Sequence, residues 1–69
     1  MEFAERLREL RKEKKETQVQ VAEAVEMTER QYQGLEGGTS LPSYRNFCAL
    51  ADHFDVSLDY LAGRKDQRS

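Results

Sequence analysis

The most varied hydrogen-bonding side chains of this 69-residue chain stand close together at residues 28–33. Thr28, Glu29, Arg30 and Gln33 offer a hydroxyl, a carboxylate, a guanidinium and an amide. Such groups bind polar ligand edges, whereas catalysis needs a convergent set: a nucleophile with its base, paired carboxylates in a cleft, a metal set, or a glycine-rich phosphate loop after a strand. The sequence contains none of these sets. It therefore indicates a binding protein that needs no cofactor, rather than an enzyme.

Two helix starts would position these side chains. Thr17 is followed three residues later by Gln20, and Thr28 is followed three residues later by Gln31. Each pair is a capping box, in which the Thr hydroxyl accepts from an early helical N–H and the Gln reaches back to the N–H of the cap. Only residues 26 and 27 remain between the two helices, so the helices must cross at a steep angle, and a helix-turn-helix is predicted. The apolar stripes consist of Val21, Ala22 and Val25 in the first helix and Tyr32 and Leu35 in the second.

The second helix of this motif, about residues 28–36, is expected to lie in the major groove of double-stranded DNA. Helices in this position read base edges with their N-terminal residues. Arg30 suits a guanine edge, Gln33 suits an adenine, and Glu29 suits the amino group of a cytosine. The predicted base contacts are therefore Thr28, Glu29, Arg30 and Gln33.

The same stretch resembles the helix-turn-helix of the phage repressor, Cro and Xre-type regulators. The resemblance continues into residues 6–11 and 56–64, so it covers nearly the whole chain. It implies an all-α, compact five-helix, repressor-like DNA-binding domain at residues 1–63, with helices 2 and 3 forming the motif, and a polar tail at residues 64–69. It also implies a transcriptional regulator, expected to be a repressor of the Cro/C1 type that binds a double-stranded DNA operator. The matching residues in the motif are Gln18, Ala22, Val25, Tyr32 and the closing Leu35, Glu36, Gly37 and Gly38.

Further site residues follow from the resemblance. Gln18 matches a family position that binds phosphate, helped by the N-terminus of its own helix. Arg11 and Glu36 are expected to form an intramolecular ion pair between the first and third helices. The family often forms homodimers through its last helix, which indicates Leu58, Tyr60 and Leu61 as interface residues. Additional phosphate contacts are expected from Gln31, Thr39, Ser40 and Arg45.

Three positions depart from the family pattern. Lys15 and Glu16 stand where the family usually has Gly and an apolar residue, so we expect an altered first connection and the loss of one core contact. Glu26 stands in the turn, where Gly usually adopts a positive φ. A side chain there costs on the order of 1 kcal/mol, unless the turn tightens differently.

Gly34 lies inside the third helix, where glycine lowers helix propensity by roughly 1 kcal/mol relative to alanine. One interpretation is a close approach to a DNA backbone or a protein partner. The other is a tolerated surface glycine.

The remaining helices complete a small core. Residues 3–15 form the first, with Phe3, Leu7 and Leu10 at helical spacing, and its charged residues are interpreted as a solvated face. Ser43 caps the fourth helix and Ser57 caps a short last helix. The fourth helix is expected to bury Tyr44, Phe47, Leu50, Ala51 and Phe54, with Cys48 half-buried and His53 exposed to solvent.

The charge balance opposes the DNA interpretation. A formal net charge of −2 has the wrong sign for a phosphate binder, and residues 26–36 carry Glu26, Glu29 and Glu36 against Arg30 alone. The alternative is a protein-interaction module of the same fold, an antitoxin-like or antirepressor partner with weak or no DNA binding.

Compartment and metal content follow from simple counts. One Cys and one His can form neither an internal disulfide nor a zinc site. No apolar run approaches the ~20 residues of a membrane span, and no secretory signal is present. The cytoplasm is the expected compartment, with no membrane partner.

Overall fold

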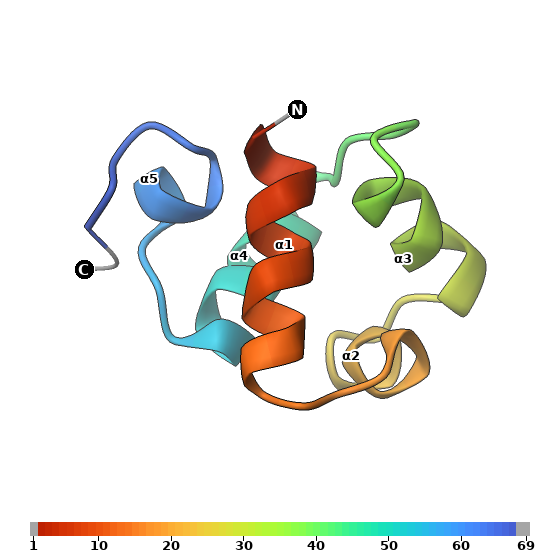
Figure 1. Cartoon of the computed structure of the whole chain (residues 1–69). Helices are drawn as coiled ribbons and strands as arrows, with labels where there is room; N and C mark the ends of the chain where they lie inside the picture. The colour runs from red at the N-terminus through yellow and green to blue at the C-terminus, as the bar shows by residue number, and fades with distance from the viewer. Residues whose placement is uncertain (1, 68–69) are drawn as a thin grey trace.

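Helix α1 runs through the middle of the molecule, as Figure 1 shows. Helices α2 and α3 lie on one side of it, α5 lies on the other, and α4 lies behind it in this view. The computed structural model describes residues 2–67, and within them the predicted all-α, five-helix architecture is confirmed. The helices are α1 (Glu2–Glu13), α2 (Gln18–Ala24), α3 (Glu29–Glu36), α4 (Tyr44–Phe54) and α5 (Leu58–Leu61).

Helices α2 to α5 each begin directly after a hydroxyl residue. The side-chain oxygens of Thr17, Thr28, Ser43 and Ser57 each accept a hydrogen bond from the backbone N–H three residues later. At the two Thr caps the Gln side chain also accepts from the N–H of the cap, at 2.8 and 3.1 Å. Both predicted capping boxes are therefore confirmed, and each cap stabilises its helix by about 1 kcal/mol.

The core takes one large side chain from every helix. The largest wholly buried side chains among residues 2–67 are Leu7, Val21, Tyr32, Leu50 and Leu61. Burying one such side chain contributes roughly 1.5–3 kcal/mol. The core therefore holds α2 and α3 together at the steep angle predicted for them: Figure 1 shows α2 nearly along its axis, whereas α3 lies across the view.

Three helix ends use left-handed residues that are not glycine. Lys15, Glu26 and Asp55 have φ values of 57°, 60° and 56°. Helix α1 ends at Glu13, two residues before its predicted end, and Lys15 therefore lies in the connection to α2. Glu26 keeps the left-handed turn of the family instead of tightening it. Each such side chain costs roughly 1–2 kcal/mol of backbone strain.

Two predicted environments on α4 are wrong. Tyr44 was expected in the core but is 77% exposed. The core ends at the edge-to-face contact between Phe3 and Phe47, whose ring centroids are 5.8 Å apart, and Tyr44 lies one turn beyond that contact. His53 was expected in solvent, but its side chain is only 17% exposed and its Nε2 lies 2.8 Å from Oε1 of Glu16.

The contact between Glu16 and His53 replaces the apolar contact that was expected to be lost at position 16. Glu16 stands where the family has an apolar residue, and here a polar pair joins the first connection to α4. Lys14 adds a bond from its Nζ to the carbonyl oxygen of His53, at 3.1 Å. Cys48 is half-buried, as predicted.

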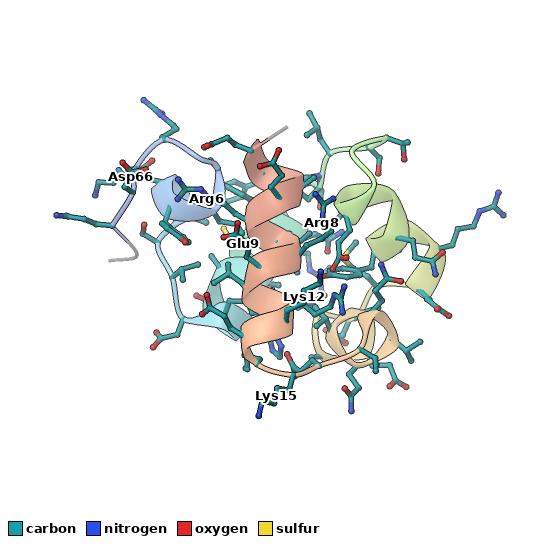
Figure 2. The ribbon with its side chains drawn as sticks, in the orientation of Figure 1. Arg6, Arg8, Glu9, Lys12, Lys15 and Asp66 are labelled. Carbon is teal, nitrogen blue, oxygen red and sulfur yellow. The ribbon has the colours of Figure 1, made fainter. Side chains whose placement is uncertain are left out.

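The chain after α5 lies against α1. Arg6 donates to the carbonyl oxygen of Lys65 at 2.6 Å and pairs with Asp66 at 3.2 Å, and Figure 2 shows its side chain directed toward Asp66. Its guanidinium also lies 4.2 Å above the Tyr60 ring. The division into a domain at 1–63 and a tail at 64–69 stays a prediction, and residues 68–69 of that tail lie outside the described residues. Within residues 2–67, no helix has the length and apolar composition needed to cross a membrane.

Candidate nucleic-acid interface

The first turn of α3 presents the predicted base-contacting side chains on the surface. Thr28, Glu29, Arg30 and Gln33 are all exposed. The Thr28 hydroxyl accepts from the N–H of Gln31 at 3.1 Å, which fixes the start of the helix. No ion pair or hydrogen bond of the Arg30 side chain is present among residues 2–67, so its five N–H donors are available to a ligand.

A chain of side-chain hydrogen bonds connects α2 with both ends of α3. Gln33 Nε2 lies 3.2 Å from Glu29 Oε2 and 3.5 Å from Gln18 Oε1. Gln18 Nε2 donates to Glu36 Oε1 at 3.1 Å. Since an amide nitrogen carries two N–H groups, Gln18 keeps a second donor for a phosphate. The contacts orient both glutamines before any ligand binds.

Glu36 and Arg11 form the ion pair expected from the resemblance. Arg11 Nε lies 2.6 Å from Oε2, and Nη2 lies 3.1 Å from Oε1, so the pair is bidentate. The side chains are 3% exposed for Glu36 and 16% exposed for Arg11. The pair joins α1 to the C-terminal end of α3 and so fixes the position of the motif relative to α1.

The charges of this pair are mutually dependent. Burial alone would raise the pKa of Glu36, but the hydrogen bonds from Arg11 and Gln18 and the charge of Arg11 outweigh it and lower the pKa. The hydrogen bond with Glu36 raises the pKa of Arg11. The buried Tyr32 hydroxyl lies beside the carboxylate without a hydrogen bond of ordinary geometry, and burial and the Glu36 charge raise the pKa of Tyr32. Glu36 is therefore an anion at neutral pH.

The loop after α3 packs onto Gly34. Thr39 N and Ser40 N donate to the carbonyl oxygen of Gly34 at 3.0 and 3.3 Å, and the Thr39 hydroxyl donates to it at 3.2 Å. A Cβ atom on Gly34 would lie 2.8 Å from Ser40 Oγ. The close approach at this glycine is therefore made by the protein's own loop, which neither sequence interpretation anticipated.

The other predicted phosphate contacts are spread around the motif. Gln31 is exposed, and its Oε1 is occupied by the capping box. Arg45 is exposed at the start of α4 and borders a cavity of about 370 Å³ with Glu26, at the C-terminal end of α2. Gln18 lies at the opposite end of α2. Gln18 and Arg45 therefore flank this helix, and they would meet different stretches of a DNA backbone.

Sequence reasoning missed Arg8. Its Nη1 donates at 2.6 Å to the carbonyl oxygen of Glu36, the last residue of α3. Figure 2 shows Arg8 on the side of α1 that faces α3. The spacing of Arg8, Arg11 and Lys12 on one helix face was a signal that could have revealed it.

The predicted dimer residues differ in their availability. Tyr60 is 8% exposed and Leu61 is wholly buried, so both contribute to the core, whereas Leu58 is 36% exposed. Of the three, Leu58 alone offers its side chain to a partner. The more exposed apolar side chains are Leu41 and Tyr44, which border a cavity of about 310 Å³.

Comparisons with known proteins agree with this geometry. The model of a family described as a helix-turn-helix domain matches residues 2–63. The chain is 36% identical over 64 residues to the cryptic phage CTXphi transcriptional repressor RstR of Vibrio cholerae, covering 93% of this chain and 57% of the relative. It is 38% identical over 64 residues to each of two Bacillus subtilis proteins, the uncharacterised HTH-type transcriptional regulator YobD and the HTH-type transcriptional regulator AnsR. These alignments cover 93% of this chain and 57% and 55% of the relatives. The chain thus spans little more than half the length of these relatives, and no solved structure matches it significantly.

Proposed function

Because the chain belongs to the helix-turn-helix domain family, of the phage repressor, Cro and Xre type, we propose that it binds double-stranded DNA sequence-specifically and regulates transcription. The family match at residues 2–63 includes the whole motif and the core that supports it. The names of RstR, YobD and AnsR support transcriptional regulation, and the name of RstR supports repression.

The observation that carries the proposal is Arg30, which lies on the exposed first turn of α3 and has no ion pair within the described chain. In the major groove, Arg30 donates two hydrogen bonds to O6 and N7 of a guanine. Gln33 exchanges its bond with Glu29 for an adenine edge, which frees the Glu29 carboxylate to accept from a cytosine amino group. Gln18 holds a phosphate with its second N–H, which sets the position of the motif on the backbone.

A homodimer is part of the proposal. One domain of this size covers one half-site, and repressors of this geometry gain affinity by pairing half-sites roughly 34–36 Å apart. We assign Leu58 to the interface, because its side chain is exposed near the start of α5.

The test begins with duplexes selected from a random DNA pool. On the selected site, Arg30→Ala should cost about 1–3 kcal/mol of binding free energy and relax the preference at one base pair. Gln18→Ala should weaken binding to every sequence alike without changing its salt dependence, because a neutral amide contacts phosphate. Arg45→Ala should lower the slope of log affinity against log salt by about one.

Two outcomes would contradict these roles. If Arg30→Ala weakens all sequences equally, Arg30 contacts the backbone and not a base. If the wild-type protein selects no duplex, the interaction-module alternative replaces the DNA proposal. The acidity of residues 26–36, with three Glu against one Arg, favours that alternative.

A further inference from the structure

The charges of α1 are separated into two stripes. Its basic residues Arg8, Arg11, Lys12 and the following Lys15 recur at i, i+3, i+4 and i+7, which places them on one face. The acidic residues Glu5, Glu9 and Glu13 recur every four residues and follow another face. Figure 2 shows Arg8 and Glu9 on opposite sides of the helix. The net charge of −2 therefore conceals a local basic surface.

The basic face is the one that borders the helix-turn-helix. Arg8 donates to the carbonyl oxygen of Glu36, and Arg11 pairs with its carboxylate. Gln18, the predicted phosphate contact at the start of α2, donates to the same carboxylate. Three side chains from two elements thus converge on one residue, and this places the basic face of α1 beside the phosphate-binding end of α2.

The cations of this face differ in how much of their charge is available. Arg11 is neutralised by Glu36, whereas the Arg8 side chain contacts a carbonyl oxygen and has no ion pair among residues 2–67. The Lys12 side chain is exposed and has no ion pair or hydrogen bond among residues 2–67. A favourable contact with the helix dipole accounts for a cation in the last turn of α1, but Arg8 stands in the middle of the helix, where the dipole has little effect.

The motif itself lacks the charge that a phosphate backbone requires. Residues 17–36 contain one cation, Arg30, against four Glu. Elsewhere, Arg6 is engaged with Tyr60, Lys65 and Asp66, and Lys14 with the carbonyl oxygen of His53 near the end of α4. Among the predicted phosphate contacts, Arg45 alone carries a positive charge. Nucleic-acid affinity rests largely on cations that neutralise phosphates, so these have to come from an element beside the motif.

We propose that Arg8 and Lys12 of α1 form a backbone-binding surface that neutralises phosphates of the DNA strand contacted by Gln18. Arg8 keeps one N–H on the carbonyl oxygen of Glu36 and offers its others to phosphate, while Lys12 acts as a mobile point charge. This proposal rests on DNA binding by the motif. It adds α1 to the elements that contact DNA, and it assigns to α1 a share of the salt-dependent affinity beside that of Arg45 on α4.

The test compares Lys12→Ala with Lys65→Ala on the selected duplex at several salt concentrations. Both variants remove one positive charge from an exposed lysine. Arg6 holds the carbonyl oxygen of Lys65, and the neighbouring Asp66 lies on the opposite side of α1 from Arg8 in Figure 2. Lys12→Ala should lower the salt slope by about one and weaken binding roughly eightfold at 0.1 M salt, with the base preference unchanged. Lys65→Ala should leave the slope at its wild-type value.

A second variant, Arg8→Gln, keeps a neutral donor for the carbonyl oxygen of Glu36 and should also lower the slope by about one.

Each outcome decides the proposal. Equal slopes for Lys12→Ala and Lys65→Ala overturn it, whereas the Arg30→Ala result on the same duplexes still judges the DNA proposal separately. A change of base preference in Lys12→Ala also overturns it, because a phosphate contact carries no sequence information. If the wild-type protein binds no duplex at all, both proposals are overturned. Urea unfolding of each variant shows whether a lost contact reflects a lost fold.

Discussion

At the scale of the residue, Glu36 is the point where the motif and its support meet. Its carboxylate accepts from Arg11 and Gln18, and its carbonyl oxygen accepts from Arg8. An isolated buried carboxylate would be strongly unfavourable, so the fold depends on these donors. The same contacts orient Gln18, and for this reason a change at Glu36 is expected to affect both stability and DNA binding.

Replacing Arg11 by Ala should destabilise the protein by about 3–5 kcal/mol, because it leaves a Glu36 carboxylate that is 3% exposed without its cation. Urea unfolding at neutral pH measures the change. Lys12→Ala, one position further along α1, is the matched control and should change the unfolding free energy by less than about 0.5 kcal/mol. A loss below about 1 kcal/mol for Arg11→Ala would show that the pair contributes little.

Acid should weaken the fold through Glu36. The pKa of Glu36 is lowered from its ordinary value of 4.5 in the folded protein, so the folded state binds the proton less readily than the unfolded state. The corresponding stability is present above about pH 4.5 and is lost as the pH falls through the lower, folded pKa.

The measurement is the free energy of unfolding at neutral pH and at steps below it, for the wild type and for Glu36→Gln. The wild type should lose more stability on acidification than the variant, because the amide that replaces the carboxylate has no proton to gain. Parallel pH curves for the two proteins would exclude Glu36 as the source of the effect.

At the scale of the element, the helices are well specified by their sequences, whereas two of their connections contain a strained residue. Capped starts and apolar stripes specify α2 and α3, yet the chain leaves both α1 and α2 through a left-handed residue with a side chain, Lys15 or Glu26. Glycine would adopt these conformations without a steric cost. The motif is therefore held in shape by the core and the caps, against a preference of its own turns.

Lys15→Gly should raise the free energy of unfolding by roughly 0.5–1 kcal/mol, since removing the side chain relieves a φ of 57° and outweighs the added freedom of the unfolded chain. Lys12→Gly is the control: it removes the same side chain inside α1, where φ is negative, and should lower stability by roughly 1 kcal/mol. Thermal unfolding of the two variants checks the opposite signs. A loss of stability in Lys15→Gly would mean that the Lys15 side chain makes contacts that outweigh the strain.

At the scale of the whole molecule, the distribution of charge matters more than its sum. The chain carries a formal net charge of −2, while Arg8, Lys12 and Arg30, none of which has an ion pair within residues 2–67, lie on or beside the motif. A duplex would meet this side, and the acidic face of α1 would remain in solvent. Salt-dependent binding is thus compatible with an acidic protein.

Two copies should bind a two-fold symmetric duplex cooperatively when the half-sites are about one helical turn apart. Sedimentation of the protein, free and with the duplex, measures the stoichiometry. Inserting about half a turn of DNA between the half-sites turns them to opposite sides and should abolish the cooperativity while leaving binding to each half-site intact. A single copy on the unaltered duplex at saturating protein would refute the homodimer.

The sequence by itself determined the features that depend on neighbours within one turn of helix. Thr-x-x-Gln pairs set the starts of α2 and α3, and apolar spacing chose most of the buried residues. The pairing of Arg11 with Glu36, 25 positions apart, is of another kind, and it was indicated by the family resemblance alone. The caps and stripes could be predicted because each involves residues three or four positions apart, and its energy depends little on the rest of the chain.

Apart from Arg11 with Glu36, only the tertiary structure decided which residues meet across larger separations. Arg8 reaches Glu36 over 28 positions, and His53 reaches Glu16 over 37. Tyr44 follows the spacing of a buried stripe but lies outside the core, because no helix covers the first turn of α4 beyond Phe3 within the described part of the chain. Such contacts depend on how five short helices pack together. Periodicity shows which face of a helix is apolar, but it does not show along how much of that face another helix packs.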